Sequence, residues 1–258
     1  SGRETTYGQL EERSCRLASW LQNKGVKKGD RVAILIHNCT EVFELEFACA
    51  KIGAIELPLN WRLTKPELEY ILNDSSPEVL IYGSNFVDIA ESLLKDCSIK
   101  NSLEIDDEDQ NNEYEQALRK NIDFDVVETT HDDLIMLMYT SGTTGHPKGA
   151  MITHEMQFYN IVNLAGSARV TDKTVQLIVL PLFHTGGMNC YANPILHYGG
   201  QIVLMKEFDP GKALEIIDDP DFGITHFFAV PAPFQFMMQH PNSVSYTHPE
   251  PTRLCRIS

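Results

Sequence analysis

One segment of the chain, residues 139–149, has the residue types of a phosphate-binding loop. It reads Tyr-Thr-Ser-Gly-Thr-Thr-Gly-His-Pro-Lys-Gly, and six of its first seven residues are threonine, serine or glycine. Small residues let the backbone approach a ligand closely, exposed N–H groups can form an anion-binding nest, and hydroxyls add donors. Lys148 adds a positive charge suited to phosphate oxygens. The segment therefore predicts binding of a polyphosphate.

The loop departs from two common nucleotide-binding motifs. Lys148 is followed by Gly149 rather than by serine or threonine, and its spacing from Gly142 differs from that of a Walker A loop. No G-x-G-x-x-G follows an apolar strand, so dinucleotide binding finds no support. Composition alone would also allow a flexible loop without a ligand, but the ordered position of each residue argues against that alternative.

A second segment, Pro181–Met188, places a histidine beside paired glycines in the order Pro-Leu-Phe-His-Thr-Gly-Gly-Met. A lone histidine near apolar residues is more often structural than functional. We give this structural interpretation to a further set of histidines, although His146 also lies on the predicted phosphate loop: His37, His146, His154, His197 and His226.

Around these segments, helices alternate with short apolar strands. Capping boxes at Thr6 and Thr64 predict the starts of two helices, and unbroken apolar runs such as 31–36 predict strands covered on both faces. Strands are predicted at 31–36, 54–59, 78–82, 99–105, 134–139, 175–180, 201–205 and 224–230. Further helices are predicted near 40–52, 86–95, 188–197, from 209 onward, and near 233–240. The alternation predicts an α/β fold with layered, largely parallel sheets flanked by helices.

The charge of the chain argues against a nucleic-acid partner. Its 258 residues include 21 lysines and arginines against 36 aspartates and glutamates, a net charge of −15, whereas binding a nucleic-acid backbone needs a basic surface. Twelve of the acidic residues lie between Glu104 and Asp133. We interpret that stretch as a solvated acidic loop.

Cysteine usage and hydropathy indicate a cytoplasmic protein. The six cysteines are widely spaced without a C-x-x-C pair, which argues against a zinc site and favours small buried thiols in a reducing compartment. No apolar run approaches the ~18 residues that a membrane span needs. A membrane span is therefore not expected.

Residues 137–148 resemble the AMP-binding signature of the adenylate-forming superfamily, which includes acyl-CoA synthetases, peptide-synthetase adenylation domains and luciferases. Segments 6–10, 25–32 and 53–60 resemble the opening helices and strands of that family, and Pro181–Met188 resembles a downstream motif whose histidine lies beside the acyl and adenylate site. The residues that match the signature in the predicted phosphate loop are Thr140, Ser141, Gly142, Thr143, Thr144, Gly145 and Lys148.

The resemblance implies a fold like the large N-terminal domain of adenylate-forming enzymes and a two-step reaction. A carboxylate attacks the α-phosphorus of ATP, accompanied by Mg²⁺, to give an acyl-adenylate and pyrophosphate, and the thiol of coenzyme A then displaces AMP. The loop from Thr140 to Lys148 would hold the β- and γ-phosphates. His184 would line the acyl and adenylate site without acting as a general base.

The motif at 181–188 is more similar to the fatty and aryl acyl-CoA synthetase branch than to the amino-acid branch. An apolar pocket for a fatty or aromatic acid is therefore expected, although each of its side chains could instead belong to the core. The pocket residues implied by this motif and by the strand near 224–230 are Phe183, Gly186, Gly187, Met188, Phe227, Phe228, Val230 and Pro231.

The resemblance covers residues 5–241, about half of a typical family member. We expect 1–165 to form a first α/β subdomain and 170–241 to begin a second. The family's metal-binding glutamate and its C-terminal domain with the adenylation lysine would follow residue 241, so no metal ligand is identified. Residues 242–258 match no family pattern and are interpreted as non-native sequence. We expect the chain to be a truncated fragment without adenylation activity of its own.

Three functions remain open from the sequence. The first is an AMP-forming acyl-CoA synthetase that uses a carboxylic acid, ATP and coenzyme A. The second is an adenylation domain that loads a carrier protein, and the third is a non-catalytic nucleotide-binding remnant. The oligomeric state is not indicated by the sequence.

Overall fold

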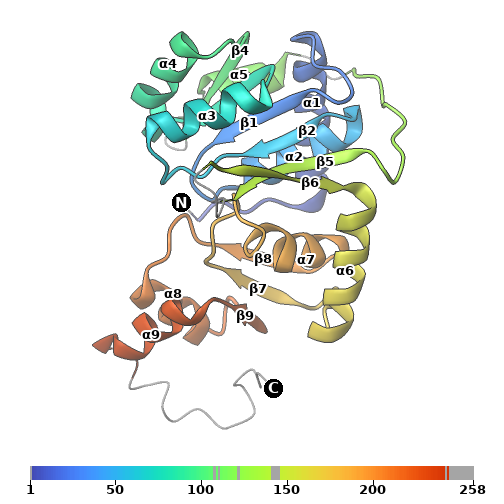
Figure 1. Cartoon of the computed structure of the whole chain (residues 1–258). Coiled ribbons are helices and arrows are strands. Elements are labelled where there is room, and N and C mark those ends of the chain that lie inside the picture. Colours follow the sequence, from blue (N-terminus) through green and yellow to red (C-terminus); the bar gives the residue numbers. More distant parts are fainter. Residues whose placement is uncertain are drawn as a thin grey trace. The chain divides into compact units, whose positions relative to one another are not determined.

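The chain folds into two units, residues 1–157 and 158–258, in a computed structural model (Figure 1). The structure describes residues 2–106, 109, 111–120, 123–140, 146–241 and 243. The boundary between the units lies within helix α6 (His154–Ala168). The middle of the predicted phosphate loop, 141–145, and nearly all of the segment 242–258 lie outside the described residues.

The first unit is built on a six-stranded sheet in the order β4-β3-β1-β2-β5-β6. Neighbouring strands from β4 to β5 run parallel, and β6 runs antiparallel to β5. Burial along the whole of β3 explains its apolar sequence, because a strand covered on both faces needs no polar alternation. β2 is buried along its whole length too, but it carries Glu56. The strands are β1 (Arg31–Leu35), β2 (Ile55–Pro58), β3 (Val79–Gly83), β4 (Asn101–Ile105), β5 (Leu134–Thr140) and β6 (Lys148–Thr153).

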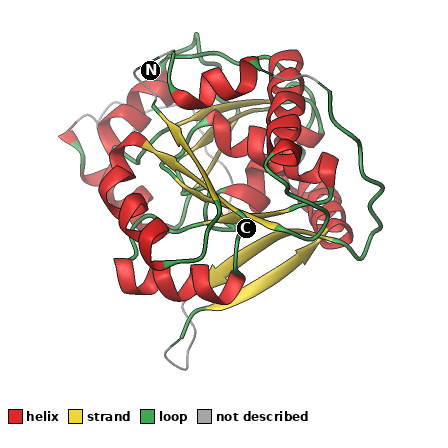
Figure 2. Ribbon diagram, turned by 90° about the horizontal axis from the view of Figure 1, so that it is seen from above, coloured by secondary structure: helices red, strands yellow, loops and turns green. Residues whose placement is uncertain are grey.

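Helices cover both faces of this sheet (Figure 2). Helices α3 and α4 pack on the face to which Ala33, Leu57 and Leu80 point, and α1 packs against α2 on the other face. The helices of the first unit are α1 (Tyr7–Asn23), α2 (Thr40–Ile52), α3 (Lys65–Ser75), α4 (Val87–Asp96), the 3₁₀ turn Ser84–Phe86 and α5 (Glu113–Arg119). In the part of the chain that the structure describes, no helix has the length and apolarity needed to cross a membrane.

Both predicted capping boxes are present and begin helices. The Gln9 backbone N–H donates to Thr6 Oγ1 at 3.2 Å, and the Thr6 backbone N–H donates to Gln9 Oε1 at 2.8 Å. At α3, the Thr64 backbone N–H and hydroxyl both donate to Glu67 Oε2, at 2.8 and 2.7 Å. These hydrogen bonds lower the pKa of Glu67. The local sequence therefore determines where α1 and α3 start.

The interpretation of residues 104–133 as a solvated acidic loop is wrong for its central part, which forms α5. Tyr114, Ala117 and Leu118 are buried there at helical spacing, and the Asn112 side chain caps the helix by accepting a hydrogen bond from the Glu115 backbone N–H at 2.9 Å. The many acidic residues around these three apolar positions made their helical spacing hard to recognise in the sequence.

Arg13 connects α5 to α1 and α2. Its Nε lies 2.6 Å from Glu44 Oε1, and its Nη2 lies 2.6 Å from Glu115 Oε1. The Tyr114 hydroxyl donates to Glu44 Oε2 at 2.7 Å. Glu44 has no exposed surface, and this burial raises its pKa even though Arg13 acts in the opposite direction. The charge of the buried carboxylate is therefore balanced mainly by Arg13, with Arg3 Nη2 farther away at 3.5 Å from Oε1.

A second buried carboxyl, Glu56 on β2, is paired with no cation among the residues that the structure describes. It is fully buried, and neither carboxylate oxygen has a hydrogen-bond partner among the described residues. Burial first, and then the nearby charge of Glu46, raises the pKa of Glu56 well above its ordinary value of 4.5. The folded chain therefore favours the protonated form.

This raised pKa predicts a stability that falls with pH and a Glu56→Gln variant that escapes the fall. Stability from the protonated carboxyl is fully present below the unfolded pKa and is lost, at about 1.4 kcal/mol per pH unit, as the pH rises towards the folded pKa. Urea denaturation should show the variant gaining stability over the native chain as the pH rises from the unfolded pKa of Glu56 towards its higher folded pKa. The exposed Glu12→Gln serves as control, and a difference between the native chain and Glu56→Gln that does not change with pH would contradict the argument.

The second unit contains a three-stranded parallel sheet in the order β8-β7-β9. Its strands are β7 (Val175–Ile178), β8 (Gln201–Leu204) and β9 (His226–Phe228). The predicted helix near 188–197 forms as a π-helix, Met188–Ala192, followed by α7 (Asn193–His197). Two further helices, α8 (Pro210–Asp218) and α9 (Pro231–Gln239), contribute Leu214 and Met237 to a core with Leu177.

Candidate functional site

The β5–β6 hairpin holds the two ends of the predicted phosphate loop side by side. Thr140 ends β5 and Lys148 begins β6, and the two are register partners in the antiparallel pair. The Thr140 hydroxyl donates to the Lys148 carbonyl oxygen at 3.5 Å. Both residues are exposed, so a hydroxyl and an ammonium are presented together. These donors suit the oxygens of a phosphate.

Helix α3 supports this end of the hairpin. The Tyr139 hydroxyl donates to Asp74 Oδ2 at 2.5 Å, and burial followed by this contact raises the pKa of Tyr139. The His146 ring stacks on Tyr70, with centroids 4.9 Å apart and planes inclined by 24°. A Cβ on Gly149 would come within 2.8 Å of Leu137 Cδ1. Anchors on both sides of the loop therefore reduce the freedom of its ends.

The predicted residues between these ends lie outside the described residues, so their contacts are not part of the observed geometry: Ser141, Gly142, Thr143, Thr144 and Gly145. Their role in phosphate binding stays a prediction.

In the second unit, the turn at 181–188 fixes the tautomer of the exposed His184. The Gly186 backbone N–H donates to His184 Nδ1 at 3.0 Å. A ring nitrogen that accepts a hydrogen bond carries no proton, so the neutral ring has its proton on Nε2. Because Nδ1 is occupied and Nε2 is a donor, neutral His184 is better suited to donate a hydrogen bond than to act as a general base.

The same turn requires glycine at position 187. A Cβ at that position would lie 2.3 Å from the carbonyl oxygen of Pro181 and 2.8 Å from that of Leu180. These are backbone atoms, which cannot rotate away as a flexible side chain can. The turn that carries His184 therefore has no space for a side chain at this position.

Gly187→Ala is expected to lower the free energy of unfolding by about 1–3 kcal/mol, because the added methyl forces the backbone apart. The matched control is Gly166→Ala in α6, where a Cβ would have nothing within 4 Å. That helix-interior change should be stabilising by roughly 0.5–1 kcal/mol. Chemical denaturation of both variants tests the contrast, and equal stability would show that the turn has room for a methyl.

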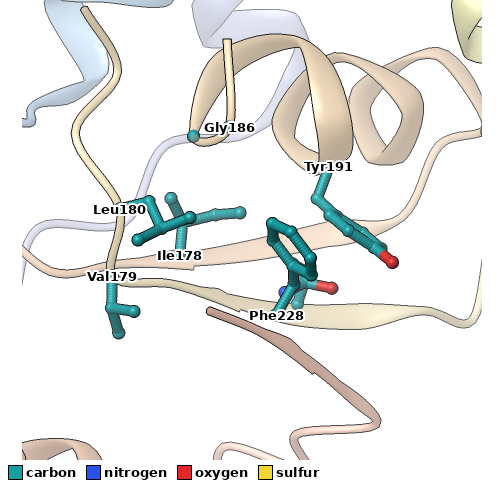
Figure 3. Close-up of a pocket in the computed structure, with 8 residues that line it drawn as sticks. Ile178, Val179, Leu180, Gly186, Tyr191 and Phe228 are labelled. Atoms are coloured by element: carbon teal, nitrogen blue, oxygen red, sulfur yellow. The ribbon is translucent and has the colours of Figure 1, made fainter. Parts of the chain in front are cut away.

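A small pocket lies between β7, the turn and the π-helix, with an empty volume of about 150 Å³ (Figure 3). The Tyr191 ring stacks on Phe228, with centroids 4.7 Å apart and planes inclined by 30°. That volume includes space open to solvent, and the lining atoms leave no room even for a water molecule inside it, so the pocket as it stands receives no ligand. The residues that line it are Gln176, Ile178, Val179, Leu180, Gly186, Gly187, Tyr191 and Phe228.

The predicted acyl-pocket residues are only partly brought together here. Gly186, Gly187 and Phe228 line the pocket, whereas Phe227 and Pro231 are not among the described residues that line it. Met188 is fully buried and Val230 is 49% exposed at the start of α9; neither these two nor the half-buried Phe183 is among the described residues that line it.

Five lining residues were missed by the sequence reasoning: Gln176, Ile178, Val179, Leu180 and Tyr191. Two of them had a signal in the sequence. Tyr191 lies one helical turn after Gly187, a spacing that could have indicated it. Gln176 is a polar residue inside an apolar strand, which is the signal that could have singled it out.

The described residues contain no group of three or more His, Cys, Asp or Glu side chains that could hold a metal ion. The Mg²⁺ that the resemblance implies therefore has no fitting ligand set in this part of the chain. Binding of nucleotide phosphates by Thr140 and Lys148 stays a prediction.

Residues 1–255 match the family model described as AMP-binding enzyme, and the chain belongs to that family. One relative is a feruloyl-CoA synthase from Amycolatopsis sp, 35% identical over 240 residues, which are 93% of this chain and 46% of that protein. Another is a fatty acid–[acyl-carrier-protein] ligase, ScoC, from Streptomyces coeruleorubidus, which is 34% identical over 248 residues. The match covers 93% of this chain and 46% of that protein. The chain therefore spans about half the length of these relatives.

Solved structures confirm the predicted fold class. The inhibitor-bound N-terminal domain of FACL13 from Mycobacterium tuberculosis has a TM-score of 0.84 and 32% sequence identity, and the match covers 93% of this chain and 59% of that domain. The mixed α/β architecture of this chain is therefore also that of the FACL13 N-terminal domain.

Proposed function

We propose that the protein carrying this chain is an AMP-forming acid–thiol ligase that activates a fatty or aromatic carboxylic acid with ATP and transfers it to coenzyme A. The observation that carries the proposal is the hairpin end at Thr140 and Lys148, which presents phosphate donors within the segment that resembles the AMP-binding signature. Relatives whose names include feruloyl-CoA and fatty acid support the choice of acid.

The reaction proceeds in two displacements because a carboxylate is a poor acyl donor. A carboxylate oxygen bonds to the α-phosphorus of ATP, and the bond from that phosphorus to the bridging oxygen breaks to release pyrophosphate. A thiol sulfur then bonds to the acyl carbon, loses its proton to solvent, and the carbon–oxygen bond to AMP breaks. The donors of Thr140 and Lys148 would hold the β- and γ-phosphates and stabilise the charge that accumulates on pyrophosphate.

His184 would contribute a hydrogen-bond donor at Nε2 beside the acyl group, in the tautomer that the Gly186 N–H selects. Mg²⁺ would neutralise phosphate charge, and we assign no residue of this chain to it. The five cysteines that the structure describes as free favour a reducing compartment, and we propose the cytoplasm: Cys15, Cys39, Cys49, Cys97 and Cys190.

ATP–pyrophosphate exchange tests the proposal in a protein that continues this chain to the length of its relatives. Ferulate, palmitate and phenylalanine are supplied separately, and exchange is expected with ferulate or palmitate. Exchange with phenylalanine instead would identify an amino-acid adenylation domain. ATP binding without exchange for any acid would identify a nucleotide-binding remnant.

One relative points to a different thiol as the acceptor of the acyl group. ScoC is named as a ligase to acyl-carrier protein, so loss of free thiol should be measured with coenzyme A and with a holo-carrier protein. Consumption of coenzyme A alone supports the proposal.

A further inference from the structure

One face of helix α3 contacts the predicted phosphate loop on both sides. The hydroxyl of Tyr139, at the start of the loop, donates to Asp74 Oδ2 at 2.5 Å. The ring of His146, nearer its end, stacks on Tyr70 with centroids 4.9 Å apart. Tyr70 and Asp74 are four residues apart in α3, so they lie on the same side of the helix. A single helical turn therefore contacts the loop before and after its middle.

Helix α3 is well suited to hold these groups in place. The capping box at Thr64 fixes its start, and at its end the Ser76 backbone N–H donates to the Leu72 carbonyl oxygen at 2.8 Å. Its opposite side contributes Leu68 and Ile71 to the core of the first unit. Groups carried by a packed helix are positioned more precisely than groups carried by a loop.

The contact with Asp74 reaches the two phosphate donors through Tyr139. Tyr139 precedes Thr140 and is the register partner of Gly149. A Cβ on Gly149 would come within 3.3 Å of the Tyr139 ring atoms Cε2 and Cζ, so the ring lies against the backbone beside Lys148. Burial, followed by the Asp74 contact, raises the pKa of Tyr139, so its hydroxyl remains a donor at neutral pH.

We propose that Asp74 is a positioning residue for the adenylation step: it holds the Tyr139 hydroxyl and thereby keeps Thr140 and Lys148 where they meet the phosphates of ATP. The inference rests on the proposed ligase function and adds a residue that lies far from the loop in the sequence. Asp74 is exposed, so water can replace its partner and stability depends little on the contact. Geometry depends on it more, because a displacement of about 1 Å can cost roughly 100-fold in rate.

A double-mutant cycle tests the proposal in a protein that continues this chain to the length of its relatives. ATP–pyrophosphate exchange is measured with ferulate or palmitate, whichever the native protein uses. Asp74→Ala and Tyr139→Phe, which removes only the hydroxyl, should each lower kcat roughly 10-fold and leave the KM for the acid unchanged. The double variant should lose no more than about twofold beyond either single variant, because Asp74 acts through Tyr139.

Two further variants separate positioning from a general effect on α3. Asp74→Asn keeps an oxygen that accepts the hydroxyl, so its kcat should stay within about threefold of the native value. Asn73→Ala, at the exposed neighbouring position, serves as control and should exchange at the native rate. All of these variants should melt at the native temperature.

Each outcome decides the inference. Native kcat in Asp74→Ala would overturn it while leaving the ligase function intact. Losses that multiply in the double variant would show that Asp74 does not act through Tyr139, and a lowered melting temperature would assign it a structural role; both would overturn the proposal. Absence of exchange by the native protein with either acid would overturn the proposed function and this inference with it.

Discussion

Replacing Lys148 with alanine is expected to lower kcat for adenylation by about 100- to 1,000-fold, the cost of removing a donor aimed at developing charge. Pyrophosphate gains charge as its bond to the α-phosphorus breaks, so the Lys148 ammonium is needed most in the transition state. The loss should therefore lie mainly in kcat and less in the KM for ATP.

The structure explains why this variant should remain folded. Lys148 is exposed, and its contact with Thr140 uses the backbone carbonyl oxygen, which alanine keeps. Lys173→Ala, at another exposed lysine, controls for the loss of a surface charge. ATP–pyrophosphate exchange measures both variants. A Lys148→Ala rate within about threefold of the native rate would remove this residue from the phosphate site.

Arg13→Ala is expected to lower the free energy of unfolding by about 3–5 kcal/mol. The change removes the closer of the two cations paired with the buried Glu44, at 2.6 Å, leaves only Arg3 at 3.5 Å, and frees Glu115 on α5 at the same time. Glu44 has no exposed surface, so water cannot replace the guanidinium. The folded chain would then have to protonate Glu44 or open the contact between α1 and α2.

The control for Arg13 is Lys100→Ala in the same unit. Lys100 pairs with Glu78 at 2.7 Å, but its side chain is 71% exposed, and such surface pairs contribute about 0–1 kcal/mol. Guanidinium denaturation of the 258-residue chain measures both variants. Similar losses for Arg13→Ala and Lys100→Ala would show that the buried network contributes no more than a surface pair.

Local signals in the sequence were enough to predict the parallel part of the first sheet. β1, β2 and β3 are short runs buried on both faces, and α1 and α3 begin at side chains that cap them. The region after the loop was not predicted, because β6 forms by pairing with β5 and its own burial is irregular. α5 was missed because its acidic residues made the stretch resemble solvent-exposed chain.

The candidate site was likewise predicted only in part from the sequence. The phosphate loop is one continuous segment, so its residue order could be matched directly. The pocket instead joins Gln176 on β7, Tyr191 in the π-helix and Phe228 on β9, which are separated along the chain and meet only in the folded unit. Apart from the one-turn spacing between Gly187 and Tyr191, no sequence spacing indicates which side chains of three separate elements face one cavity.

Transfer of ¹⁸O from the carboxylate to AMP tests the central claim most directly. A protein that continues this chain to the length of its relatives is supplied with ferulate labelled in its carboxylate, ATP and coenzyme A, and the nucleotide product is analysed by mass spectrometry. If the carboxylate attacks the α-phosphorus and the thiol later breaks the carbon–oxygen bond, the AMP formed carries the label. Unlabelled AMP, or ADP in its place, would contradict activation through an acyl-adenylate.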